Sequence, residues 1–128
     1  MNIEHFAYVV EDPLSVAKWY VEHLGFSIKR SMAESPFAHF LADGSGTVMI
    51  EIYNNPAVPV PDYRSMDPLV LHLAMASDDV ERDCERLIEA GAARMGDLLH
   101  TDDGDVLAML RDPWGFSIQL ARRGRAMV

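Results

Sequence analysis

The sequence predicts an α+β fold made of two similar βαβββ modules. Three observations support this prediction. The two halves share one layout at an offset of about 67 residues, which indicates an internal repeat. Each half begins with a short apolar run that is followed by an amphipathic helical pattern. Each helical pattern is then followed by three short strand-like segments, separated by breaks rich in Asp and Gly.

In the first half, residues 3–10 form the apolar run that we expect to be a strand. Asp12 is expected to cap the following helix, with Pro13 at its first position. Gly25 is expected to end it, because glycine readily adopts the left-handed conformation that follows a helix. The helical positions expected to face the core are Leu14, Ala17, Tyr20, Val21 and Leu24. Three strands then follow, with a break at residues 43–46, and complete a first module of residues 1–53.

The second half repeats this plan. Residues 69–76 form its first strand-like run, and a helix is expected between residues 77–79 and Gly91. Its core-facing positions are predicted to be Val80, Cys84, Leu87 and Ile88. Breaks at residues 102–104 and 112–115 separate the later strands, so the second module spans residues 69–121 and leaves a tail of residues 122–128. Residues 54–68 contain four prolines without periodicity and are expected to link the modules within one domain of residues 1–128.

The bulk composition excludes several classes of protein. The chain has 128 residues, a size typical of one domain, and is 49 % hydrophobic. Its net charge of −9 argues against binding to a nucleic-acid backbone. Cys84 is the single cysteine, so no intrachain disulfide can form, and we expect it to be an inert core residue. The sequence has no stretch typical of a signal peptide or membrane span, and a cytoplasmic location without membrane partners is expected.

Four polar residues interrupt the strand-like runs in a repeat-matched way. Because side chains alternate between the two faces of a strand, the bulky face of each run is expected to pack under a helix. The opposite face then carries His5 in the first run and Glu51 in residues 47–53. The second half matches this with His72 in its first run and Gln119 in residues 117–121. Each module thus contributes one imidazole and one side-chain oxygen.

This donor set suits one divalent metal ion per site, such as Zn, Ni, Co, Mn or Fe. The alternative is that each is an isolated polar residue on a half-exposed strand. The repeat-matched positions favour the metal, as does the cost of burying a glutamate without a cationic partner.

The residues around these positions resemble a known family. The segments IEHFAYVVEDP, WYVEHLGF, VMIEIYNNP, LVLHLA and LRDPWGFSIQL are similar to those of the vicinal oxygen chelate superfamily, which includes glyoxalase I, bleomycin-binding proteins and extradiol dioxygenases. The resemblance covers residues 1–121 and implies a cup-shaped mixed sheet around a metal that binds two oxygens of a substrate. It also assigns His5, Glu51, His72 and Gln119 as the ligands. Gln119 departs from glyoxalase I, which has a glutamate at that position.

The resemblance implies a metal-dependent lyase or isomerase of the glyoxalase type. Such an enzyme acts on a small oxygen-bearing substrate through a metal-bound enediolate-type intermediate, with Glu51 as ligand and candidate general base. Two histidines and one carboxylate also match the triad of non-haem Fe(II) dioxygenases, which gives a second interpretation. A third is a metal-free module that binds a small molecule, as bleomycin-resistance proteins do. Metal content distinguishes the first two from the third.

Further residues are candidates for lining the cup, although each has an ordinary structural role as an alternative: His39, Tyr53, His100 and Trp114. Arg111 is a weaker candidate for an anionic substrate and is expected instead at the surface. Exposed sheets and free strand edges are usually covered in soluble proteins, so a homodimer is expected, and the metal site lies either within one chain or between two.

Overall fold

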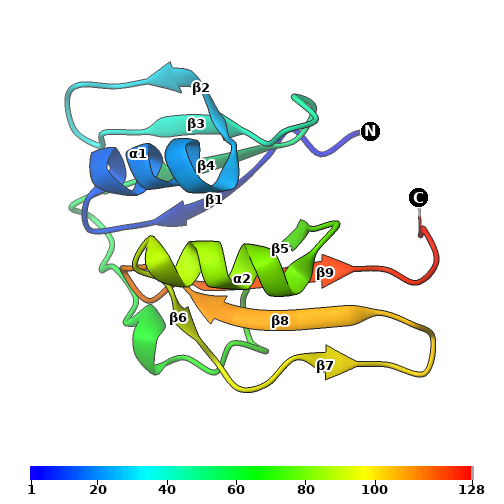
Figure 1. Ribbon diagram of the computed structural model, residues 1–128. Coiled ribbons are helices and arrows are strands. Elements are labelled where there is room, and N and C mark those ends of the chain that lie inside the picture. Colours follow the sequence, from blue (N-terminus) through cyan, green and yellow to red (C-terminus); the bar gives the residue numbers. More distant parts are fainter. Residues whose placement is uncertain (128) are drawn as a thin grey trace. The chain divides into compact units, whose positions relative to one another are not determined.

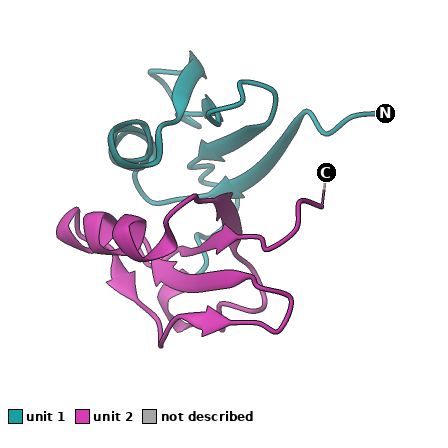
Figure 2. Ribbon diagram, turned by 45° about the vertical axis from the view of Figure 1, so that its right-hand side comes forward, with its two compact units in different colours: residues 1–61 teal, residues 62–128 magenta. Residues whose placement is uncertain are grey.

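The computed structural model describes residues 1–127, and the chain forms two compact units, Met1–Pro61 and Asp62–Val128 (Figure 2). Each unit contains one α-helix and one mixed β-sheet, as the repeat predicts. None of the helices in residues 1–127 has the length and apolar character needed to cross a lipid bilayer.

The first unit has the expected βαβββ order (Figure 1). Its elements are β1 (His5–Val9), α1 (Pro13–Leu24), β2 (Ser27–Ser31), β3 (His39–Ala42) and β4 (Met49–Tyr53). The strands lie in the order β1-β4-β3-β2. The first strand runs parallel to β4, and the other neighbours are antiparallel. Helix α1 covers one face of this sheet, so only the other face is available for the polar residues of β1 and β4.

The ends of α1 follow the prediction. Asp12 caps the helix, because its carboxylate accepts hydrogen bonds from Ser15 N at 3.0 Å and from Ser15 Oγ at 2.6 Å. These bonds also lower the pKa of Asp12. Pro13 occupies the first turn, and Gly25 ends the helix in the left-handed region with φ 73°.

The predicted core stripe of α1 is partly wrong. Ala17 and Tyr20 are buried as expected, but Leu14 and Val21 are exposed. The buried side of the helix consists of Pro13, Val16, Ala17, Trp19 and Tyr20. Both sets of residues recur at helical spacing, so the periodicity alone does not choose between them. Contact between the helix and the sheet selects the buried set, and the hydroxyl of Tyr8 on β1 donates a hydrogen bond to the Tyr20 hydroxyl at 3.1 Å.

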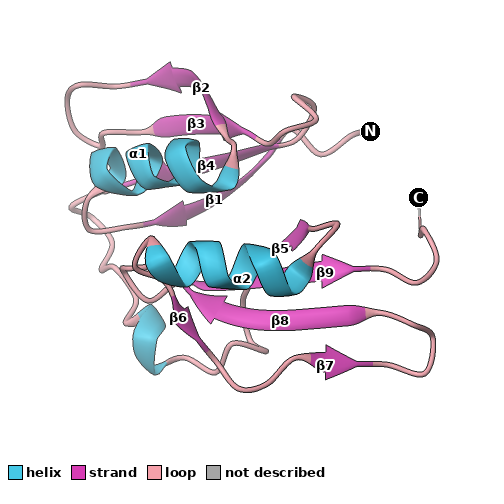
Figure 3. Ribbon diagram, viewed as in Figure 1, coloured by secondary structure: helices cyan, strands magenta, loops and turns pink. Residues whose placement is uncertain are grey.

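The second unit has a similar plan, except that two short strands stand where the first unit has one (Figure 3). Its elements are η1 (Tyr63–Ser65), β5 (Leu73–Ala76), α2 (Val80–Glu89), β6 (Ala93–Arg94), β7 (Leu99–His100), β8 (Val106–Arg111) and β9 (Ser117–Arg122). The sheet order is β5-β9-β8-β6, and β7 also pairs with β8. Thus β6 and β7 together take the place that β2 has in the first unit.

Helix α2 begins after Asp79, whose carboxylate accepts a hydrogen bond from the Arg82 main chain at 3.1 Å. Val80, Cys84 and Leu87 are buried as predicted, whereas Ile88 is exposed, contrary to the expectation. Burial raises the pKa of the Cys84 thiol, which agrees with its expected role as an inert core residue.

The first strand of the second unit is shorter than predicted. Strand β5 begins at Leu73, and residues 68–71 form a turn in which Leu69 and Val70 are exposed. The apolar run of residues 69–76 therefore predicted the strand but placed its beginning too early. The residues expected to form the linker also divide between the two units, since the second unit begins at Asp62.

Arg111 is buried, so its predicted position at the surface is wrong. It connects η1 to the later strands of the second unit. Its side chain is buried, with the residue only 6 % exposed. The guanidinium donates from Nη1 to the carbonyl oxygens of Tyr63 at 2.7 Å and Gly115 at 2.9 Å, and from Nη2 to that of Met66 at 2.6 Å. Arg111 therefore ties η1 to the turn between β8 and β9.

Candidate metal-binding residues

His5 and Glu51 form a pair in the first unit. Strand register pairs Ala7 of β1 with Glu51 of β4, and His5 lies two residues before Ala7. Alternation places all three on the same face of the sheet. His5 Nε2 lies 3.4 Å from Glu51 Oε2, and both side chains are partly exposed. The sheet thus brings together an imidazole and a carboxylate that are far apart in the sequence.

The imidazole of His5 is oriented by its neighbours. Its Nδ1 donates to the carboxylate of Glu4, and its ring meets the ring of Phe40 edge-on at 5.5 Å between centroids. A carboxylate only accepts hydrogen bonds, so the neutral ring carries its proton on Nδ1 and keeps a lone pair on Nε2, toward Glu51. The hydrogen bond with Glu4 is the largest cause of a raised pKa at His5.

His72 and Gln119 occupy the matching positions of the second unit. Strand register pairs Ala74 of β5 with Gln119 of β9, and His72 lies two residues before Ala74. The count of residues is the same as that between His5, Ala7 and Glu51, but His72 lies just before β5, which begins at Leu73. The Nδ1 of His72 donates to the Pro68 carbonyl oxygen at 2.8 Å, which leaves the lone pair of the neutral ring on Nε2.

The chemistry of these two pairs fits a divalent metal. Histidines that bind metals through one ring nitrogen usually donate the other N–H to a carboxylate or a main-chain carbonyl, which fixes the ring and its tautomer. His5 has the first kind of partner and His72 the second. Within residues 1–127, no three His, Cys, Asp or Glu side chains gather as a complete metal site. Each unit by itself therefore supplies two of the four expected donors.

The additional cup candidates do not share one surface. Tyr53 lies two residues after Glu51 on β4 and thus shares its face. His39 pairs with Ile52, and this places His39 on the opposite face, which α1 covers. In contrast to the expectation, His39 does not join Glu51.

The candidates of the second unit also lie away from Gln119. His100 pairs with Val106 of β8, whereas Gln119 pairs with Met109 of the same strand. Alternation along β8 therefore places His100 and Gln119 on opposite faces. Trp114 lies in a turn rather than on a strand, and its main-chain N–H donates to Asp112 Oδ1 at 3.0 Å.

Sequence analysis missed the residues that orient the two histidines. Glu4 adjoins His5 in the sequence, but neighbours along an extended strand point to opposite faces, so adjacency alone gave no signal. Phe40 pairs with Glu51 across the sheet, and this strand register brings its ring against that of His5. The carbonyl of Pro68 accepts from His72 only because residues 68–71 turn before β5. These contacts require the folded chain.

Two successive βαβββ units with repeat-related polar residues define a class of protein built from paired modules of this kind. The chain belongs to the glyoxalase/bleomycin resistance protein/dioxygenase superfamily, whose family model matches residues 2–120. No curated protein sequence matches the chain.

Solved structures agree with this assignment. An antibiotic-binding protein, TnmS3 from Streptomyces sp. CB03234, is 27 % identical with a TM-score of 0.73, and the match covers 96 % of both chains. A glyoxalase I mutant from Zea mays is 26 % identical with a TM-score of 0.75, covering 95 % of this chain and 45 % of that one. A glyoxalase family protein from Bacillus cereus has a TM-score of 0.80 at 19 % identity, covering 96 % of this chain and 94 % of that one, which shows the shared fold.

Proposed function

We propose that His5, Glu51, His72 and Gln119 together bind one divalent metal ion, and that the protein is a metal-dependent lyase or isomerase of the glyoxalase type. The substrate would be a small molecule with two neighbouring oxygens. One observation carries the proposal: each unit holds a repeat-matched pair whose histidine keeps a free Nε2 lone pair because an acceptor holds its Nδ1. Membership of a superfamily in which metal sites are common adds support.

The charges of the four residues indicate what each contributes. Two neutral imidazoles, one carboxylate and one carboxamide would leave a divalent ion with a formal charge of about +1. Such an ion, when bound, supplies Lewis-acid polarisation of a substrate carbonyl. Glu51 is the one carboxylate of the four, so it would accept the proton from the carbon beside that carbonyl. Gln119 has no basicity near neutral pH and would serve as a ligand or hydrogen-bond partner.

Metal content is the direct test of this proposal. Protein purified without chelator should contain about one transition-metal ion per four-residue site, as measured by elemental analysis. His5→Ala and His72→Ala should each lower metal content strongly, whereas His100→Ala should retain it, because His100 lies on the opposite sheet face from Gln119. Protein that stays empty when offered Zn²⁺, Ni²⁺ or Fe²⁺ would contradict the metal assignment.

The role of Glu51 has a separate test. Glu51→Gln should retain metal, since a carboxamide oxygen still coordinates, but should lose about 10² to 10⁴ in rate for proton transfer. Hydrogen exchange at the carbon beside the carbonyl of hydroxyacetone, followed by NMR in D₂O, provides an assay. If the variant exchanges this hydrogen as fast as the parent, Glu51 is only a ligand.

Gln119→Glu is the informative partner of that variant. It restores the two glutamates that the family resemblance assigns to glyoxalase I and lowers the formal site charge from about +1 to about 0. We expect it to retain metal and to gain weak conversion of the adduct of methylglyoxal with glutathione. Loss of metal from this variant would contradict the proposed coordination by residue 119.

Assembly can be tested with the same variants. We propose a homodimer in which His5 and Glu51 of one chain meet His72 and Gln119 of the other. Mixed dimers of His5→Ala and His72→Ala chains should then regain one intact site and half of the metal, while either variant alone stays depleted. If demonstrated heterodimers regain no metal, the site lies within one chain.

A second function is favoured by one of the comparisons. TnmS3, described as an antibiotic-binding protein, matches this chain over nearly its whole length at 27 % identity. In this alternative the four polar side chains line a cup that holds a small molecule without metal. Saturable binding of an antibiotic by metal-free protein, unaffected by added Zn²⁺ and by His5→Ala, would favour it over the enzyme.

A further inference from the structure

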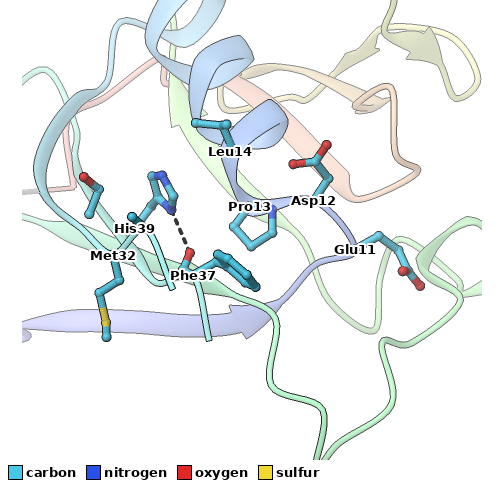
Figure 4. Close-up of a pocket in the computed structure, with 9 residues that line it drawn as sticks. Glu11, Asp12, Pro13, Leu14, Met32, Phe37 and His39 are labelled. Atoms are coloured by element: carbon cyan, nitrogen blue, oxygen red, sulfur yellow. Dashed lines mark hydrogen bonds between the residues drawn. The ribbon is translucent and has the colours of Figure 1, made fainter. Parts of the chain in front are cut away.

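The first unit contains a cavity that is separate from the His5 and Glu51 pair. It lies between the first turn of α1, the end of β2 and the loop that leads into β3 (Figure 4). Its volume is about 550 Å³, within the usual range of small-molecule sites. His39 lines it from the sheet face that α1 covers. An occupant of this cavity would therefore not touch the face that carries Glu51.

Three large apolar side chains surround this cavity: Leu14, Met32 and Phe37. They are 52 %, 42 % and 43 % exposed, although each belongs to a residue type that usually gains free energy from burial. Scattered exposed apolar residues are common, but these three come from separate segments and meet around one hollow. Such an arrangement is typical of a binding pocket rather than of ordinary surface.

His39 gives the cavity a specific polar group. The residue is only 5 % exposed, and its Nδ1 donates to the Phe37 carbonyl oxygen at 2.7 Å (Figure 4). Its Nε2 has no hydrogen-bond partner in residues 1–127. Among those residues, no fully buried side-chain nitrogen or oxygen lacks a partner, so Nε2 keeps some accessible surface on a residue that lines the cavity. In the neutral ring this atom is an acceptor, because the proton is on Nδ1.

The charges at the rim restrict the occupant further. Two acidic residues, Glu11 and Asp12, are among those that line the cavity (Figure 4), and the chain carries a net charge of −9. A carboxylate or phosphate on the ligand would be repelled by both. The cavity therefore favours a neutral or cationic molecule, mostly apolar, that presents one N–H or O–H donor to His39.

We propose that this cavity is a second ligand site, in which a small aromatic alcohol, phenol or amine packs against Leu14, Met32 and Phe37 and donates a hydrogen bond to His39 Nε2. This site is independent of the metal site proposed above. It would operate whether or not His5 and Glu51 bind a metal.

Matched probes test the chemistry of the site. 4-Ethylphenol presents an O–H donor, 4-ethylanisole is the same ring with that donor methylated, and 4-ethylbenzoate carries a negative charge. In ¹H–¹⁵N NMR titrations of the full chain, 4-ethylphenol should bind saturably and shift the signals of Met32, Phe37 and the His39 imidazole. 4-Ethylanisole should bind about five- to tenfold more weakly, the span expected for one lost hydrogen bond, and 4-ethylbenzoate weakest of all.

Two surface variants of α1 locate the binding. Leu14→Trp fills the rim of the cavity, and Val21→Trp places the same side chain on an exposed position of the same helix that does not line it. Leu14→Trp should weaken 4-ethylphenol binding at least tenfold, and Val21→Trp should leave it unchanged. Because both positions are exposed, both variants are expected to fold.

His39→Leu tests the hydrogen bond itself. This variant should bind 4-ethylphenol and 4-ethylanisole equally, since the acceptor is gone while the apolar wall remains. Equal binding of the two probes by the parent protein would overturn the assignment of Nε2 as the acceptor. Absence of saturable binding of 4-ethylphenol, or shifts confined to His5 and Glu51, would overturn the second site altogether.

Discussion

Replacing Arg111 with methionine tests the structural role that burial gives to its guanidinium group. This group donates to the main-chain carbonyls of Tyr63, Met66 and Gly115, and no carboxylate lies within ion-pair distance of it in residues 1–127. Methionine keeps an apolar stem of similar length but has no donor. The substitution therefore leaves three main-chain acceptors without their partner in a buried environment.

The expected cost follows from two opposing effects. A buried acceptor that loses its hydrogen bond costs about 1 to 3 kcal/mol, and three carbonyls are affected here. Removing the charge recovers part of the free energy spent on burying it. We therefore expect Arg111→Met to lower the free energy of unfolding by about 3 kcal/mol, a large part of the 5 to 15 kcal/mol that is typical of a domain.

Urea denaturation followed by circular dichroism measures this change. With a slope of about 2 kcal/mol per molar urea, the unfolding midpoint should fall by about 1.5 M. Arg122→Met is the matched control, because Arg122 is exposed at the end of β9 and should change stability by less than about 0.5 kcal/mol. Arg111→Lys should lose most of the same stability, since one ammonium cannot span carbonyls from separate segments.

The comparison with the control decides the outcome. If Arg111→Met unfolds at the same urea concentration as Arg122→Met, the hydrogen bonds of Arg111 contribute nothing net to the fold. Its burial would then reflect the packing of its aliphatic stem alone.

Two further substitutions test the helix cap and a tight turn. Asp12→Ala should cost about 1 kcal/mol at neutral pH through loss of the α1 cap. Hydrogen bonds from Ser15 lower the pKa of Asp12, so this contribution to stability is present above the unfolded-state pKa and disappears as pH falls through the folded-state pKa. The urea midpoints of variant and parent should therefore converge in acid. A gap between them that stays constant with pH would refute the reasoning. Gly115→Ala should lower the free energy of unfolding by about 2 to 3 kcal/mol, because φ at Gly115 is 95° and the new Cβ would lie 2.9 Å from Arg64 Cβ. Gly44→Ala is the control: its new Cβ meets no atom within 4 Å, so the urea midpoint should hardly change.

Local signals predicted the elements of the fold well. Helix α1 begins after Asp12 and ends at Gly25 as expected, and α2 begins after Asp79, at the end of the expected segment 77–79, because caps and turns depend on a few neighbouring residues. The alternation of β4 also identified which of its residues face away from the core, whereas on β9 Ser117 and Ala121, which share the face of Gln119, are buried. The metal assignment of Glu51 and Gln119 stays a prediction.

The same local signals failed where two patterns compete. Leu14 and Val21 recur at helical spacing as regularly as Val16 and Trp19 do, and only contact with the sheet selects the second pair. His39 illustrates the same limit for strands, since its face depends on pairing with Ile52 rather than on its own neighbours.

The sequence by itself determined the repeat, the order of the elements and the four repeat-matched polar positions, because these depend on periodicity and on capping residues that act over a few positions. Tertiary structure decided which ring nitrogen of His5 and His72 stays free, that Arg111 is buried, and that His39 lines a cavity under α1. These features depend on strand register and on hydrogen bonds between distant segments. Such contacts form only when the chain folds, so residue composition and spacing do not predict them.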